Sequence, residues 1–517
     1  MKRTYKVIFI LCLLVNIVIR LPLQKYEIGV DSYFLHGLAQ SILDSNHFAY
    51  ILNPLSLIGL YPYSYPIGTS LVLSSISLVT RLDLTYVILI ISIIIGILGF
   101  ILAFKISEYF LPNKSFSMIS GLVFSLGLDF LYLTTFSASS RALFIIFFLT
   151  IIFSLFKYIQ TNKAKLLIIT LILSIFSLFI HRLFAVIILV LGIFILVNII
   201  YQPFIKFRNC HKISSTIFIY FLIISIFIGS VFYTEIPGNF HPYSKHYINA
   251  IAFLFLRYLR ATGILLPFSL LGLFLFITKK NIKKTDLFLI LTIISMSPFI
   301  NYETYAPAVT SIFLAILSAY TLTIILKIIK QPIFYPLLSF VVVILIASSG
   351  LFQVWQPSII AARSQSDERY AIQKDLSFLN ILEKSSKIVV NDPVLLGRLQ
   401  AFRPCLFSGG DVFPLVCNLV NITNMRIVRT NPTTKIIQTK QLFQLTDSEF
   451  RYIIDYALDS NEPKSDYLKT LATRYGIRYL VENTLQAPYN GKWIKNIKSS
   501  EDKLYSNGKI NLWHIYG

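Results

Sequence analysis

Long hydrophobic runs, separated by short polar and basic segments, dominate the first 352 residues of the chain. Runs of this length and composition predict membrane-spanning helices, although several fall short of the ~20 residues that ~30 Å of hydrocarbon requires. We predict eleven spans, at 7–20, 84–104, 115–133, 142–158, 166–180, 183–201, 213–233, 261–278, 286–300, 304–326 and 333–352. The serine-rich segment 67–80 is shorter than a usual span and is ambiguous.

The basic residues between the runs decide how segment 67–80 is placed. If it does not cross the membrane, the short lysine- and arginine-bearing loops all lie on the side of the N-terminus, as the positive-inside rule requires. If it crosses, they all lie on the opposite side. We therefore predict an interfacial or re-entrant helix at 67–80 and one long outer loop at 22–83. The N-terminus is then cytoplasmic, in a multi-pass protein of the plasma membrane.

From residue 353 onward charged residues return and the periodicity changes. Short runs typical of strands occur at 387–390, 477–481 and 510–516, with helical patterns at 446–459 and 465–475. We predict a small extracytoplasmic α/β domain in 353–517, with its ordered part at 365–517. The fold class is therefore an all-α polytopic membrane module, 1–352, followed by this domain.

Composition narrows the class of function. The chain is 56% hydrophobic and only 14% charged, whereas soluble domains are nearer a quarter charged. The net charge of +22 is spread through short loops, and a nucleic-acid-binding protein would concentrate it in one polar domain. Nucleic acid is therefore excluded as a partner. Cys405 and Cys417 can pair in an oxidising compartment, but no Cys and His spacing indicates a metal site.

The first outer loop carries a carboxylate, Asp31, in an otherwise uncharged run. The segment 31–43 predicts an amphipathic helix along the membrane, with one apolar side formed by Phe34, Leu35, Leu38 and Ile42. Asp31 suits an N-cap, and it suits equally a general base that takes a proton from an acceptor hydroxyl or amine. His36 suits a contact with a phosphate or acceptor, or a polar anchor at the interface.

A tyrosine and proline cluster follows, with Tyr61, Tyr63 and Tyr65 alternating around Pro62 and ending at Pro66. The two prolines prevent a helix here and favour extended backbone. The three tyrosines suit stacking on a sugar ring, and they suit equally an aromatic belt at the membrane interface.

These features together resemble the glycosyltransferase C superfamily. The chain has an Asp in a long first outer loop, an interfacial helix, and a Tyr-Pro-x-x-x-Pro-x-Gly-like entry to the next helix. Within the superfamily it is most similar to the protein O-mannosyltransferase and aminoarabinose-transferase group, and more distantly to the oligosaccharyltransferase catalytic subunit. The resemblance covers about residues 1–260. It implies an extracytoplasmic active site, with Asp31 as the catalytic Asp and Pro62 and Pro66 as the loop prolines.

The second outer loop, 134–141, departs from the family pattern because it has no carboxylate. Asp129 is the nearest acid, and by our prediction it lies inside a span. A divalent metal held between two loops is a cofactor that the resemblance suggests but this loop does not support. No other cofactor is expected.

Cationic side chains on the predicted outer side are candidates to neutralise a sugar-phosphate leaving group. For each one the alternative is an anchor that extends to the membrane interface. They are Arg141, His181, Arg182, Arg257 and Arg260.

The sequence thus predicts an inverting membrane glycosyltransferase. It would move a sugar from a polyprenyl- or dolichyl-phosphate carrier to an extracytoplasmic protein, lipid or glycan. Three alternatives stay open: a non-catalytic scaffold, a glycan or lipid exporter, and an O-antigen-type ligase or polymerase in which arginines rather than Asp31 dominate. Few polar residues lie in mid-span, which argues against an exporter.

Overall fold

The structure, a computed structural model, divides the chain into two compact units. The first unit contains 1–27 and 88–356, and the second contains 28–87 and 357–517. The residues described are 3–22, 27, 30–45, 66–210, 224, 263–279, 281–296, 305–328, 387–390, 477–483, 503–506 and 510–514.

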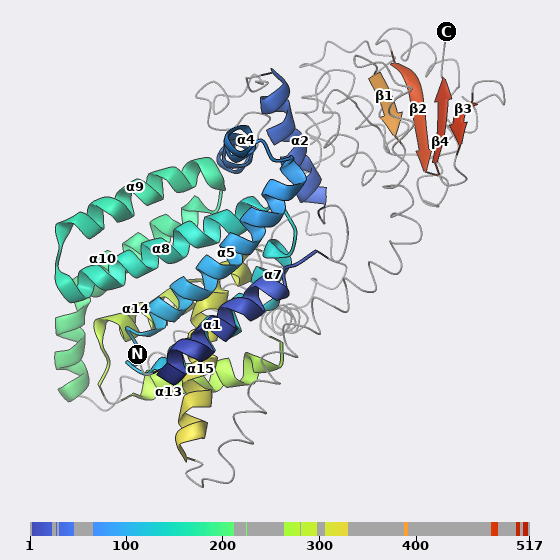
Figure 1. Cartoon of the computed structure of the whole chain (residues 1–517). Coiled ribbons are helices and arrows are strands. Elements are labelled where there is room, and N and C mark those ends of the chain that lie inside the picture. Colours follow the sequence, from blue (N-terminus) through green and yellow to red (C-terminus); the bar gives the residue numbers. More distant parts are fainter. Residues whose placement is uncertain are drawn as a thin grey trace. The chain divides into compact units, whose positions relative to one another are not determined.

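The described part of the first unit is helical (Figure 1). In chain order its helices are α1 (Arg3–Val18), α5 (Leu84–Ser107), α6 (Lys114–Ser125), α7 (Leu128–Thr134), α8 (Ser140–Thr161), α9 (Ala164–Ile180), α10 (Phe184–Cys210), η2 (Gly263–Leu265), α13 (Leu266–Thr278), α14 (Lys284–Met296) and α15 (Tyr305–Ile328). Helix α5 begins in the second unit and continues into the first. Within the described residues, four helical stretches are long and apolar enough to cross a membrane: 84–107, 140–161, 184–206 and 309–328.

Eight of the eleven predicted spans coincide with helices, and two more, 213–233 and 333–352, lie outside the described residues apart from residue 224. The prediction of one uninterrupted span at 115–133 is wrong, because α6 ends and α7 begins within it. Leu126 closes α6 with an N–H bond back to the Leu122 carbonyl, and Gly127 is extended with ψ of 141°. The sequence does not show such a break, because two short helices in an apolar environment have the same continuous apolar composition as one long helix.

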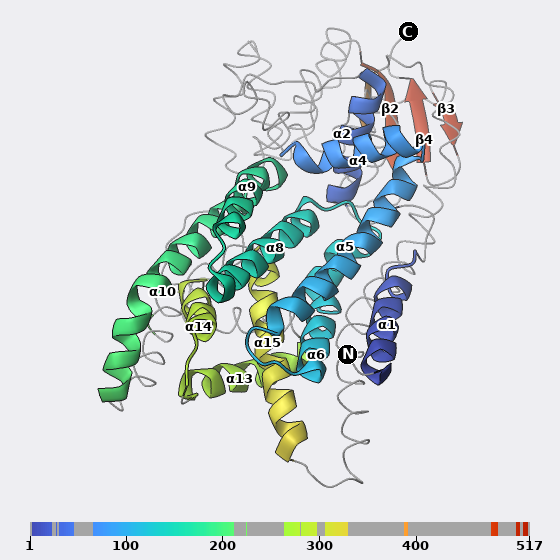
Figure 2. The same ribbon diagram turned by 60° about the vertical axis from the view of Figure 1, so that its left-hand side comes forward.

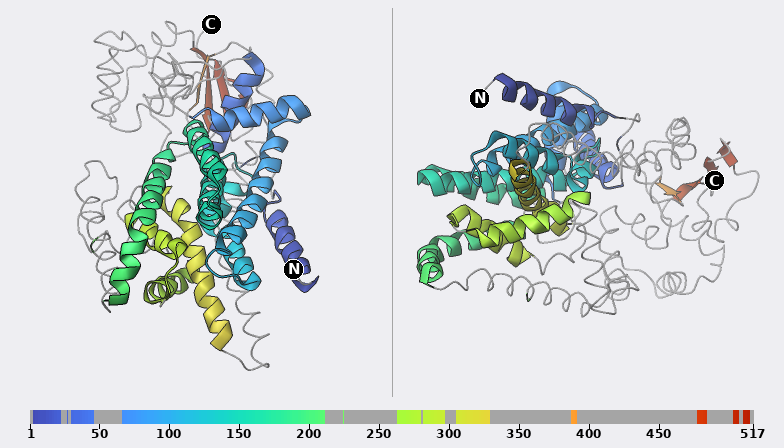
Figure 3. Two further views of the ribbon diagram at one scale, coloured as in Figure 1. Left: turned by 90° about the vertical axis from the view of Figure 1, so that its left-hand side faces the viewer. Right: turned by 90° about the horizontal axis from the view of Figure 1, so that it is seen from below.

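Close crossings hold this bundle together. Helices α8 and α9 form an antiparallel pair in which the Ser154 hydroxyl donates to the Leu166 carbonyl at 2.9 Å. Helices α13 and α15 cross at small residues (Figures 2 and 3). There the Ser269 hydroxyl donates to the Leu314 carbonyl, and a Cβ on Gly272 would lie 2.1 Å from the Leu317 carbonyl oxygen. Small residues at helix crossings are typical of membrane bundles, since they allow the backbones to approach.

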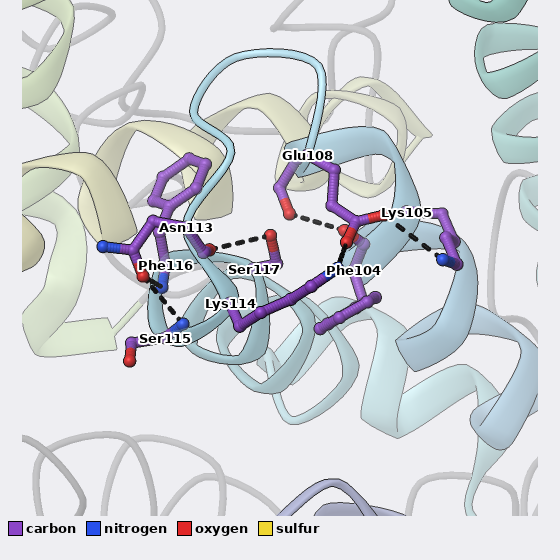
Figure 4. A network of polar contacts seen from close by, with 9 residues as sticks. Phe104, Lys105, Glu108, Asn113, Lys114, Ser115, Phe116 and Ser117 are labelled. Atoms are coloured by element: carbon purple, nitrogen blue, oxygen red, sulfur yellow. Dashed lines mark hydrogen bonds and ion pairs between the residues drawn. The ribbon is translucent and has the colours of Figure 1, made fainter. Parts of the chain in front are cut away.

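The turn between α5 and α6 shows why a charged segment ends one helix and starts the next (Figure 4). Asn113 is extended, and its side chain accepts from the amides of Ser115 and Phe116 at 2.9 and 3.3 Å. It therefore caps two of the amide groups that lack partners within α6. The Glu108 carboxylate pairs with both Lys105 and Lys114.

A second charged turn joins α13 to α14. The fully buried Asp286, in the first turn of α14, accepts from the Lys279 ammonium at 2.7 Å and from the Lys283 amide at 2.9 Å. A carboxylate in this position also suits the positive end of the helix dipole. Lysines 105, 114 and 279, predicted as inner-loop charges, therefore also fix the geometry of two turns.

The described part of the second unit contains α2 (Val30–Ser45), α4 (Gly68–Thr80) and a four-stranded sheet. The strands are β1 (Lys387–Val390), β2 (Ile477–Asn483), β3 (Lys503–Ser506) and β4 (Ile510–His514), in the order β1-β2-β4-β3. Strands β1 and β2 are parallel, while β4 is antiparallel to both β2 and β3. Strands at 387–390, 477–481 and 510–516 were predicted and are confirmed. The predicted helices at 446–459 and 465–475 lie outside the described residues.

Candidate functional site

The predicted catalytic residue, Asp31, is the second residue of α2. It therefore lies within the first helical turn, and not at the N-cap position that the alternative interpretation predicted. A carboxylate in a first turn is favoured by the helix dipole. The side chain of Asp31 lies outside the described part of the structure.

Helix α2 is more deeply packed than an interfacial amphipathic helix. Buried side chains occur on more than one side of it: Ser32, Tyr33, Leu35, His36, Leu38, Ala39 and Ile42. His36 is only 3% exposed, so it is not the exposed interfacial anchor that we considered. Helix α2 packs against α4, the helix predicted at 67–80 (Figure 2). The two outer-loop helices are therefore one packed pair within the second unit.

Two groups of candidate residues lie outside the described residues and stay predictions. These are the tyrosines Tyr61, Tyr63 and Tyr65, and the arginine pair Arg257 and Arg260.

The other three cationic candidates are brought to one end of the α8–α9 pair. Arg141 is the second residue of α8, while His181 ends α9 and Arg182 follows it. The rings of Phe144, one turn beyond Arg141, and His181 lie 6.1 Å apart, which places the start of α8 beside the end of α9. His181 is buried, with its Nδ1 accepting from the Leu183 amide at 3.1 Å, whereas Arg182 is exposed. Arg141 and Arg182 thus supply positive charge at one end of the helix pair, and His181 adds an imidazole ring beside them.

Sequence reasoning missed the role of Arg20, which lies just beyond α1 and is fully buried. Its Nε donates to the Thr134 hydroxyl at 2.9 Å, and one terminal nitrogen donates to the Ser125 carbonyl at 2.7 Å. The other terminal nitrogen donates to the backbone and side-chain oxygens of Asn16, at 3.1 and 2.9 Å. No described carboxylate pairs with Arg20. Its neutral partners therefore stabilise the buried charge.

Arg20 joins the C-terminal ends of α6 and α7. Ser125 is the last residue of α6 and Thr134 is the last of α7, and one guanidinium donates to both. The Ser125 carbonyl lies in the last turn of α6, so no amide of that helix donates a hydrogen bond to it. The first outer loop leaves from Arg20 and the second from Thr134. Arg20 therefore fixes the starting points of both predicted outer loops.

The second outer loop is held in place from α5. The Ser92 hydroxyl donates to the Ser137 carbonyl at 3.1 Å and accepts from the Ser137 amide at 3.3 Å. The preceding residue, Phe136, has a left-handed backbone with φ of 45° and a ring that is 2% exposed. Such a conformation is uncommon for a residue other than glycine, and here the buried ring holds it. The loop leading to Arg141 is therefore built rigidly.

Asp129 lies in a different place from the predicted one. It is in the first turn of α7, after the break, and not in the middle of a continuous span. The signal that could have found it is Gly127 followed closely by an acid, a common helix start. Among the described residues, no group of three or more His, Cys, Asp or Glu side chains could hold a metal ion. A divalent metal therefore stays an expectation from the resemblance.

Comparisons with known proteins give a match in structure and none in sequence. The sequence matches no protein-family model and no curated protein. The structure is similar to the archaeal oligosaccharyltransferase AglB from Archaeoglobus fulgidus, solved in complex with an inhibitory peptide and a dolichol-phosphate. The TM-score is 0.53 at 11% identity, over 93% of this chain and 69% of AglB. This chain therefore has a fold similar to that of AglB.

The fold shared with AglB agrees, as a fold, with the superfamily likeness that the first loop indicated. The neighbour represents the oligosaccharyltransferase type, which we had placed as the more distant likeness. The O-mannosyltransferase and aminoarabinose-transferase group stays a prediction. Together with the long apolar helices, the fold identifies a membrane protein.

Proposed function

We propose that this protein is a membrane glycosyltransferase that takes its sugar from a polyprenyl- or dolichyl-phosphate carrier. The observation that carries the proposal is the likeness of its fold to AglB, a glycosyl-transferring enzyme solved with a dolichol-phosphate. The acceptor would be an extracytoplasmic protein, lipid or glycan. The sugar, hexose or pentose, is left to experiment.

In this proposal Asp31 is the general base. The acceptor oxygen or nitrogen attacks the anomeric carbon of the sugar, and its proton passes to the Asp31 carboxylate. The bond between the anomeric carbon and the phosphate oxygen breaks at the same time. The carrier leaves as a lipid phosphate, and the configuration at the anomeric carbon is inverted. The position of Asp31, early in α2, is given by the helix bounds, and its role as the base is part of the proposal.

The cationic end of the α8–α9 pair is the proposed counter-charge for the leaving phosphate. Arg141 and Arg182 supply permanent charge, and His181 adds a hydrogen-bonding ring that is held by its contacts with Phe144 and Leu183. Charge-assisted hydrogen bonds of this kind stabilise a leaving phosphate more than neutral ones do. Arg257, Arg260 and the three tyrosines are further candidates to bind the donor.

The test is sugar transfer by purified protein from a panel of radiolabelled polyprenyl-phosphate sugars. Asp31→Asn keeps the size of the side chain but cannot accept the proton. We expect transfer by the natural chain and a loss of at least about a hundredfold in Asp31→Asn. As a matched control, Asp83→Asn changes an exposed carboxylate that accepts from the Thr85 amide, and transfer should be retained.

Other outcomes separate the alternatives. Equal transfer by Asp31→Asn would remove Asp31 from the mechanism and favour the ligase or polymerase type, in which the arginines dominate. No transfer from any donor would favour the non-catalytic scaffold or the exporter. Loss of transfer in a metal chelator, with recovery on adding one divalent ion, would support the metal that the resemblance suggests.

A further inference from the structure

Helix α4 buries its polar side and exposes its apolar side. Thr69, Ser70, Ser74 and Ser77 are all less than 9% exposed, and they lie on one side together with Leu73. The opposite side carries Leu71, Val72, Leu78 and Val79, of which Val79 is 84% exposed. In water this arrangement would be unfavourable, because apolar surface is best buried and polar groups are best solvated. It suits a helix whose outer side faces lipid.

The buried hydroxyls of α4 fall into two groups. Towards the C-terminal end, Ser74 donates to the Leu71 carbonyl at 3.2 Å and Ser77 donates to the Leu82 carbonyl at 2.7 Å. At the N-terminal end, the hydroxyls of Thr69 and Ser70 are buried and have no partner among the residues that the structure describes. A buried hydroxyl without a hydrogen bond costs roughly 1–3 kcal/mol, so two adjacent ones call for a functional explanation.

These two hydroxyls lie in the first turn of α4, where backbone donors also lack helical partners. The first hydrogen bond of the helix is donated by the Leu71 amide to the carbonyl of the N-cap residue, Ile67, at 3.0 Å. The amides of Gly68, Thr69 and Ser70 come before it and have no acceptor within the helix. Ile67 is the N-cap residue and provides no side-chain cap. Because Cα–Cβ bonds tilt towards the helix N-terminus, the hydroxyls and these amides are directed to the same end.

We propose that the N-terminal turn of α4 binds the phosphate group of the polyprenyl-phosphate lipid, through the Thr69 and Ser70 hydroxyls and the first-turn amides. A helix N-terminus favours an anion, and hydroxyl donors add charge-assisted hydrogen bonds. An interfacial helix, as predicted for 67–80, with this exposed apolar side would lie at the depth of the lipid head groups. The choice of a lipid phosphate rests on the proposed function. The anion site rests on the geometry of α4.

The experiment measures binding of a radiolabelled polyprenyl phosphate to the immobilised full-length protein in detergent. The matching polyprenol, which has the same tail without phosphate, and inorganic phosphate are the two comparison ligands. The test variant is Thr69→Val with Ser70→Ala, which removes both hydroxyls at nearly constant volume. The matched control is Ser74→Ala, because Ser74 is equally buried on the same side but its hydroxyl has a partner.

We expect the double variant to bind polyprenyl phosphate on the order of ten- to a hundredfold more weakly. Its binding of polyprenol should not change, and Ser74→Ala should bind both lipids like the natural chain. Without ligand, the double variant should unfold at the same temperature as the natural chain or higher, because it loses two unpaired buried polar groups. A merely structural role for these hydroxyls would lower that temperature.

Three results would overturn the proposal. They are unchanged binding of polyprenyl phosphate, an equal loss of polyprenol binding, or a lower unfolding temperature in the double variant. If inorganic phosphate bound as tightly as the lipid, the site would be one for free phosphate and the lipid assignment would be wrong.

Failure of the proposed function can be recognised separately. Asp31→Asn should bind polyprenyl phosphate like the natural chain, whatever its activity. If the protein bound polyprenyl phosphate more tightly than polyprenol but transferred no sugar, the α4 site would be supported and the transferase function rejected. Transfer by the double variant with an unchanged KM for the donor would reject the α4 site and retain the transferase.

Discussion

Gly96 and Arg20 provide a direct test of how the first helix is joined to the bundle. A Cβ built on Gly96 in α5 would lie 2.1 Å from Nε of Arg20, 2.4 Å from Cζ and 2.5 Å from Cδ. Ordinary contacts at a Cβ are 3.4 Å or longer, so the guanidinium would have to withdraw by more than about 1 Å. A shift of that size breaks the bonds to Thr134 and Ser125. We therefore expect Gly96→Ala to destabilise the protein.

The magnitude follows from these contacts. Each hydrogen bond from a charged donor contributes about 1.5–3 kcal/mol, and two such bonds are at risk. Alanine regains about 0.5–1 kcal/mol over glycine within a helix. A net loss of about 3 kcal/mol is therefore expected for Gly96→Ala, a large effect for a single substitution. In an Arg20→Ala background the Cδ, Nε and Cζ atoms that form the obstacle are gone, and the same change should be neutral or slightly stabilising.

The assay is thermal unfolding in detergent of the natural chain, both single variants and the double variant. The coupling energy between the two positions should be about 3 kcal/mol, as expected for residues in direct contact. Gly192→Ala in α10 is the matched control, because a Cβ there would meet nothing within 4 Å. If Gly96→Ala cost as much in the Arg20→Ala background as in the natural chain, crowding against Arg20 would not be the cause.

Three further substitutions test the turns and crossings of the bundle, each by the unfolding temperature in detergent. Asn113→Ala removes the cap of α6 and should cost about 1 kcal/mol, whereas Asn113→Ser should cost much less; equal losses would contradict a capping role. Gly272→Ala puts a Cβ 2.1 Å from the Leu317 carbonyl oxygen and should force α13 and α15 apart. An unchanged unfolding temperature would show that this crossing can widen freely. Lys279→Met leaves the buried Asp286 carboxylate without its ion pair and should lower the free energy of unfolding by about 3–5 kcal/mol. Adding Asp286→Asn removes the unpaired charge and should recover much of that loss.

The helices of the membrane part could be predicted because lipid leaves the chain few choices. Backbone groups in hydrocarbon must be satisfied within the segment, so an apolar run such as 84–104 or 142–158 forms a helix. The short helix at 68–80 was also predicted, from its weak apolar character and the distribution of basic loops. Strands such as β4 followed from short runs typical of strands within the charged C-terminal part. Strand β3 was missed because its charged and exposed residues show no apolar run.

The candidate site could be predicted only in part, because tertiary contacts decide what a polar residue does. Arg20 was only the last residue of the predicted span 7–20, and the fold alone brings the ends of α6 and α7 to it. Likewise, the serines of α4 show no preference for inside or outside in sequence. Arg141, His181 and Arg182 were predicted as separate cations, and the antiparallel pairing of α8 and α9 joins them. The assignment of Asp31 still rests on the family resemblance.

The contacts of Arg20 also bear on how the protein is made. Its partners Ser125 and Thr134 follow it by 105 and 114 residues. During synthesis, therefore, α1 enters the membrane long before the groups that stabilise its terminal charge exist. Until α7 is complete, the guanidinium must stay at the membrane surface, where water can solvate it. The contacts that join the first helix to α6 and α7 are thus formed late in synthesis, whereas the bonds of Arg20 to Asn16 can form with α1 itself.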